Sequence, residues 1–179
     1  TQFKSVTSAQ IAAMGETQAA AMTVAQIGTL SEEQANSLTA EQLVKFDTQV
    51  KVEALKPALL ATLDGETQLA AMTPEQVAFF TKPQMTALSG DQLSKMTTEQ
   101  LAELSTEQIG AIRITELPSL SEEQIASFDP ATQMSGFSTA QIKALSDTQV
   151  KALTALQVKA LSSSQISAIE TDDLKAMSE

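Results

Sequence analysis

Apolar residues recur along this chain with a period of eight, which matches neither the two-residue period of a strand nor the 3.6-residue period of a continuous helix. From Thr7 the sequence divides into twenty-one octads of the form [ST]-x-x-Q-[ILV]-x-A-[LMF], with single extra residues at Asp47, Asp64 and Asp129. The fifth position is apolar in every octad, and the eighth is always Leu, Met, Phe or Ile. Such self-similarity is typical of repeat proteins, whose units bury a shared core by stacking.

Each octad carries the signals of a helix start. Ser or Thr occupies the first position in fifteen octads and Gln the fourth in seventeen, which is the spacing of a capping box. The apolar residues on either side of the box form a hydrophobic staple, as between Leu104 and Ile109. Pro57 and Pro74 follow the first position, where a helix tolerates proline. The sequence therefore predicts one helix of about six residues per octad.

Two other architectures fit the pattern less well. In one continuous helix, a stripe that repeats every eight residues would move about 80° around the axis per octad, so the chain must turn once per octad. A β-solenoid would need alternating apolar residues and many glycine turns, but the octads are rich in helix-forming residues and the chain has only 6 glycines.

These observations predict an all-α solenoid of about twenty-one very short capped helices in a single domain spanning residues 1–179. Regular repeats span 7–177, with irregular units near 47–63 and 113–120. Positions five and eight should face inward, and positions two, three and six should face solvent. We expect two helices per coil, which would give about ten coils and a rod of roughly 80–100 Å. Three helices per coil would shorten the rod by about a third, and the sequence alone does not decide between them.

The charge of the chain disfavours anionic partners. Its formal net charge is −11, from 22 acidic and 11 basic residues, which argues against nucleic acid and against anionic membrane surfaces. An acidic face could instead attract cations or a basic protein. There is no cysteine and no apolar run of about 18 residues, so we expect neither disulfides nor membrane insertion.

Residues suited to catalysis or to metal binding are scarce. The chain contains no His, Cys, Trp or Tyr, which removes the commonest general base, the thiol nucleophile and the usual transition-metal ligands. Adjacent acids at Glu32–Glu33, Glu122–Glu123 and Asp172–Asp173 lie in first helical turns, where the helix dipole favours them. We therefore expect no enzyme activity, no catalytic or metal site, no cofactor and no small-molecule substrate.

A few residues depart from the repeat and could contact a protein partner. Phe79 replaces the small residue of the seventh position, and Arg113 replaces the Ser/Thr cap. Pro118 lies inside the same octad as Arg113, where we expect a shortened helix. Phe79, Arg113 and Pro118 are the candidate partner-contact patch.

Octads such as STEQIGAI, STAQIKAL and SDTQVKAL resemble the short T-x-x-Q-[IV]-x-A-L repeats of very large bacterial surface or secreted proteins of the adhesin-like, or haemagglutinin-like, type. The resemblance covers 7–177 and is weakest in the octads that begin at Lys56 and Arg113. It implies a stalk, spacer or scaffold located outside the cell or on the bacterial surface. No functional residue carries over.

Two other functions remain open at this stage. A solenoid can bind a protein or peptide along one face. It can also self-associate head to tail into a filament, because the first and last octads, TSAQIAAM and ETDDLKAM, resemble internal ones.

Overall fold

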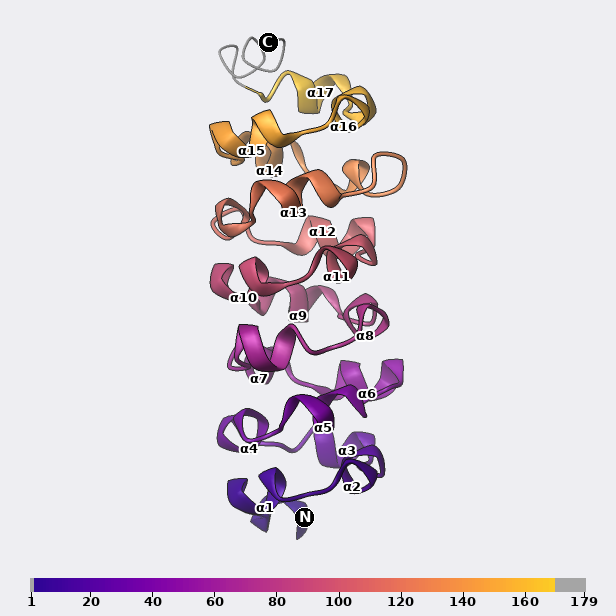
Figure 1. Cartoon of the computed structure of the whole chain (residues 1–179), viewed down its shortest axis with the longest axis vertical. Helices are drawn as coiled ribbons and strands as arrows, with labels where there is room; N and C mark the ends of the chain where they lie inside the picture. Colours follow the sequence, from indigo (N-terminus) through magenta and orange to yellow (C-terminus); the bar gives the residue numbers. More distant parts are fainter. Residues whose placement is uncertain (1, 170–179) are drawn as a thin grey trace.

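The chain forms an elongated stack of short helices, with its first and last helices at opposite ends (Figure 1). This computed structural model describes residues 2–169, so the octad 170–177, with Asp172 and Asp173, lies outside it. All regular elements in the described range are helical, and none is a strand. The prediction of an all-α solenoid built from very short helices is confirmed.

The helices begin where the capping boxes predict. In the octad of Thr97, the hydroxyl accepts the N–H of Gln100 at 3.2 Å, and Gln100 Oε1 accepts the N–H of Thr97 at 3.0 Å. Pro57 and Pro74 both lie at the start of a helix, as expected. Two to six residues separate one helix from the next, so each octad contains both a helix and a corner.

The helices stack in three columns, because the main contacts join helices three octads apart. The first column contains α1 (Ser8–Ala12), α4 (Glu32–Asn36), α7 (Pro57–Leu60), α9 (Lys82–Ala87), α12 (Thr106–Ala111), η4 (Met134–Gly136) and α16 (Ala155–Ala160). The second contains α2 (Glu16–Ala20), α5 (Ala40–Val44), η2 (Gly65–Leu69), α10 (Gly90–Lys95), η3 (Leu117–Ser119), α14 (Thr139–Lys143) and α17 (Ser163–Ile166). The third contains α3 (Val24–Ile27), α6 (Gln49–Ala54), α8 (Pro74–Ala78), α11 (Thr98–Ala102), α13 (Glu122–Ser127) and α15 (Asp147–Ala152). A short helix η1 (Gln2–Ser5) precedes them.

The expectation of two helices per coil is therefore wrong. Helix α9 packs on α7 and α12, which are the helices of the third octad before it and the third octad after it. Three helices per coil give about seven coils and a rod of roughly 55–70 Å. The octad period alone could not show this, because it fixes where the chain turns but not by how much.

The core is a continuous apolar column inside the three helix columns. Residues of the fifth and eighth positions are buried almost throughout, with Met14, Val158 and Ile166 only partly so. Phe128 and Phe137 pack edge to face, with ring centroids 5.0 Å apart. The charged residues expected on the surface, such as Glu32 and Lys143, are exposed.

The fourth-position glutamine is also buried, and it links one coil to the next. Gln100 is only 1% exposed, and its Nε2 donates to the carbonyl oxygens of Leu69 at 3.0 Å and Met72 at 2.7 Å. These two acceptors are the fifth and eighth residues of an octad four units earlier. Helix α11 stacks on α8, which lies three octads back. The octad 65–72 comes directly before α8, so it ends at the corner below the start of α11.

The same two acceptor positions recur along the rod. They receive bonds from Gln42, Gln68, Gln76, Gln84, Gln92, Gln108, Gln124, Gln133, Gln141, Gln149, Gln157 and Gln165. We call these contacts the glutamine ladder. The last carbonyls of a helix have no partner within it, and here they are buried. The ladder supplies that partner.

The three inserted aspartates do not all act alike. Asp64 and Asp129 replace the Ser/Thr cap and widen the first turn by one residue, so the glutamine that accepts their N–H lies four residues on. The inserted residue therefore lengthens the turn at both positions. Asp47 does not cap α6 and instead lies 3.6 Å from Lys51, the residue in the glutamine position of that octad.

Replacing Gln100 by alanine should destabilise the protein by about 2–4 kcal/mol. The change leaves two buried carbonyls and the N–H of Thr97 without partners. The matched control is Gln10→Ala, because Gln10 makes the same capping box but bonds to no other coil within the described chain. Its loss should amount to about 1 kcal/mol or less. Urea denaturation monitored by circular dichroism measures both, and equal effects would contradict the inter-coil role.

Candidate functional site

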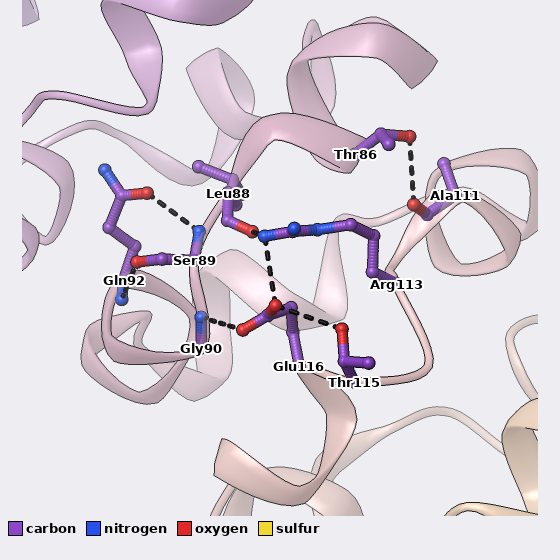
Figure 2. A network of polar contacts seen from close by, with 9 residues as sticks. All are labelled: Thr86, Leu88, Ser89, Gly90, Gln92, Ala111, Arg113, Thr115 and Glu116. Carbon is purple, nitrogen blue, oxygen red and sulfur yellow. Dashed lines mark hydrogen bonds and ion pairs between the residues drawn. The ribbon is translucent and has the colours of Figure 1, made fainter.

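The octad 113–120 is the place where the structure departs furthest from the repeat. Glu116 replaces the glutamine, and a carboxylate cannot donate to the carbonyls below it. Arg113, in the cap position, supplies the missing donor: its Nη2 lies 3.0 Å from the carbonyl oxygen of Leu88 and 3.1 Å from Glu116 Oε1 (Figure 2). An ion pair between Arg113 and Glu116 thus takes the place of the capping box.

The carboxylate of Glu116 turns towards the start of α10. Its Oε2 accepts the N–H of Gly90 at 2.6 Å, and its Oε1 accepts the hydroxyl of Thr115 at 3.1 Å (Figure 2). This approach requires a glycine, because a Cβ at position 90 would lie 2.1 Å from Ser119 Oγ and 2.9 Å from Ser119 Cβ. The irregular octad is therefore matched to one specific octad beneath it.

The structure does not bring the three predicted partner-contact residues together. Arg113 belongs to the ion pair just described, and Pro118 is exposed in η3, in the second column. Phe79 is the C-cap residue that follows α8, in the third column, where it is half-buried and packs against the core. Partner contact through these residues stays a prediction. The expected shortening of the helix in this octad is confirmed, since only Leu117–Ser119 are helical.

Sequence reasoning missed the inter-coil role of the glutamines. A capping box accepts Glu as readily as Gln at its fourth position. Yet Gln occurs in seventeen octads and Glu only at Glu116. A strong preference for an amide over an acid is the signal for a required donor, and the one Glu comes with its own donor, Arg113.

Acidic side chains gather on part of the third column. The octads of α8, α11 and α13, which pack on one another, carry Glu75, Glu99, Glu103, Glu122 and Glu123 and no basic residue. All five are exposed. Within residues 2–169, no three His, Cys, Asp or Glu side chains converge as metal ligands would. None of the described helices has the length and apolarity to cross a bilayer.

The capping aspartates are the acids whose hydrogen bonds most clearly stabilise the charged form. Asp64 Oδ1 accepts the hydroxyl of Thr67 at 2.6 Å and its N–H at 2.7 Å, and these bonds hold the pKa of Asp64 below its ordinary value. The side-chain and backbone bonds of Thr132 lower the pKa of Asp129 in the same way. For Glu41 and Glu99, bonds to their own backbone N–H lower the pKa most. None of these acids has the raised pKa that a general acid needs.

Surface depressions near the first coils are open to solvent. One is lined by Val6, Thr7, Leu30 and Gln34, between α1 and α4. A neighbouring one, lined by Leu30, Lys56 and Leu59, lies between α4 and α7. Neither is lined by a buried ionisable group, so neither has the features of a catalytic pocket.

Comparison with known proteins supports the repeat itself. A family model described as the ALTTAQ repeat matches residues 131–163. The frame of that name agrees with the octads, since Ala152–Gln157 reads ALTALQ across the end of one octad and the start of the next. No curated protein was found to match the chain. The chain is therefore similar to a repeat family over part of its length.

Replacing Gly90 by alanine should destabilise the protein by about 1–3 kcal/mol, as expected when a side chain is forced into filled space. Rotation of Ser119 does not relieve the clash, because its Cβ is also too close. The control is Gly15→Ala, where the nearest atom to an added Cβ is Gln18 Oε1 at 3.9 Å. It should change stability by less than about 1 kcal/mol. Thermal unfolding measures both, and an undisturbed Gly90→Ala protein would refute the close approach of octad 113–120.

The contribution of Asp64 to stability should disappear in acid. Because its pKa is lowered by folding, the stabilisation is fully present above the unfolded pKa of about 3.9 and is lost as the pH falls through the lower, folded value. The difference in urea midpoint between wild type and Asp64→Ala should therefore narrow below pH of about 4. Thr67→Val, which removes the stronger of the two bonds, should weaken this pH dependence. A difference that stays constant with pH would contradict the linkage.

Proposed function

We propose that this chain is a non-enzymatic structural segment, acting as a stalk, spacer or scaffold in a bacterial surface or secreted protein of the adhesin-like type. The observation that carries the proposal is the glutamine ladder, which joins successive coils along most of the described rod. A core and a hydrogen-bond pattern that repeat from coil to coil hold two points at a fixed distance, and that distance grows with the number of repeats.

The chemistry of the side chains supports the non-enzymatic part of the proposal. The sequence has no His or Cys, and the Ser and Thr hydroxyls that could serve as nucleophiles are occupied as helix caps, as in Ser105 and Ser121. The resemblance of the octads to those of bacterial exoproteins supports an extracellular or cell-surface location.

A spacer should change length in whole coils. Residues 138–161 are three regular octads, so their removal deletes one coil and leaves the frame of the repeat intact. The maximum dimension from small-angle X-ray scattering should fall by about 8–10 Å, and duplication of the same residues should raise it equally. The helical signal per residue should remain constant in both variants.

The control deletes residues 138–157. This deletion is of similar length, but it ends in the middle of an octad and removes Thr154, the N-cap of α16. This variant should lose helix beyond the junction. If the in-frame deletion unfolds the protein, or leaves its length unchanged, the chain is not a modular spacer and the proposal fails.

A further inference from the structure

The glutamine ladder has one gap that is not repaired. In two consecutive octads the glutamine is replaced, first by Lys51 and then by Leu59. By the register of the ladder, these residues lie above the ends of the octads 15–22 and 23–30. The ladder bonds to residues 15–30 therefore depend on what Lys51 and Leu59 can donate. Besides them, the exposed Glu16 side chain forms an ion pair with Lys45 at 2.9 Å.

Lys51 replaces its glutamine only in part. Its Nζ donates to the carbonyl oxygen of Ala20 at 2.7 Å, whereas a ladder glutamine bonds the fifth and eighth residues of the octad. The ammonium also lies 3.6 Å from Asp47 on its other side. The cap of this octad, Thr48, makes no side-chain capping bond.

Leu59 donates nothing. Its side chain is 4% exposed, so it fills the glutamine position with apolar volume. The carbonyls of Ile27 and Leu30, which correspond to the ladder acceptors elsewhere, receive no side-chain hydrogen bond within the described chain. The octad of Leu59 begins at Lys56, which also makes no side-chain capping bond.

Near the same place the core contains two small residues at positions that carry larger apolar side chains elsewhere. The fifth position is Ala19 in the octad 15–22 and Ala35 in the octad 31–38, whereas every other octad carries Ile, Leu, Val or Met there. Burial of alanine removes much less apolar surface from water than burial of these larger side chains. The first octad, by contrast, is held by Gln42, which bonds the carbonyls of Ile11 and Met14.

From these observations we propose that residues 15–30 form the least stable segment of the solenoid. This segment detaches from the second coil while the rest of the stack stays folded. Solenoid stability is close to a sum of terms from neighbouring repeats, so the interface with the fewest bonds and the least burial opens first. The departure at Glu116 does not act this way, because Arg113 bonds the carbonyl of Leu88 and Glu116 accepts the N–H of Gly90, so two side-chain bonds still join these octads. The device follows from the fold and does not depend on the proposed spacer function.

Hydrogen exchange of the full chain, read by NMR, tests the proposal. The amides of Ala19, Met22, Ile27 and Leu30 should exchange at least tenfold faster than the equivalent amides of Leu101, Leu104, Ile109 and Ile112, all of which donate within their own octads. They should also exchange faster than those of Ile11 and Met14, which lie nearer the start of the chain. Exchange that simply quickens toward the start of the chain would overturn the proposal.

A repair variant tests the cause. Lys56→Thr combined with Leu59→Gln restores a capping box and an amide donor above Ile27 and Leu30, and it should slow the exchange of residues 23–30 at least threefold. Leu59→Met keeps the apolar volume without a donor and should leave that exchange unchanged. If the repair variant folds and has no effect on the exchange, the gap in the ladder is not the cause.

A converse variant covers the case in which the repair disturbs folding. Gln92→Leu removes the bonds to the carbonyls of Leu60 and Leu63 in an intact part of the ladder. It should create a second region of fast exchange at residues 57–63. Full protection there would show that a missing ladder glutamine does not weaken an interface, and the proposal would fall.

Discussion

The structure depends on how the ends of very short helices are satisfied once they are buried. A helix of about six residues has more orphan backbone groups at its ends than hydrogen bonds within it, and it is unstable alone. Here both ends are served by one side-chain type. The glutamine oxygen accepts the N–H at the start of its own helix, and the glutamine nitrogen donates to the carbonyls at the end of another. The amide works because it is both an acceptor and a donor, which neither Glu nor Leu can be. Stacking buries the amide, and burial strengthens the bonds that make stacking favourable.

Local features of the fold could be predicted from the sequence, and non-local ones could not. Capping boxes, prolines in first turns and the inward fifth and eighth positions all act within one octad, so Thr97–Gln100 and Pro74 could be placed correctly. The number of helices per coil and the acceptors of each glutamine depend on contacts between residues about thirty positions apart, as from Gln100 to Leu69. Most octads look alike, so the pattern of the repeat does not show which octads are neighbours.

At the candidate site, too, the sequence indicated the unusual residues but not their long-range contacts. The sequence singled out Arg113 and Pro118 as departures from the repeat, and the structure explains the first by the loss of an amide donor at Glu116. The pairing of Glu116 with Gly90 lay beyond reach, since it joins two octads that are distant in sequence. The short helix η4 was also missed, because its octad keeps the glutamine, Gln133, and the apolar fifth and eighth positions. Departures from a repeat thus show which octads are unusual, but the residues that these octads contact can be identified only from the structure.

A chain of near-identical units faces an error that ordinary domains do not, namely slippage by one whole unit into a stack almost as good as the native one. Most octads could exchange places without a visible penalty. The pairing of Glu116 with Gly90 is different, because position 90 is the sole second position in the array occupied by glycine, and a Cβ there would lie 2.1 Å from Ser119 Oγ of the octad above. This one pair of non-standard octads therefore favours the native stacking register over registers shifted by whole octads, although most of the other octads are nearly identical.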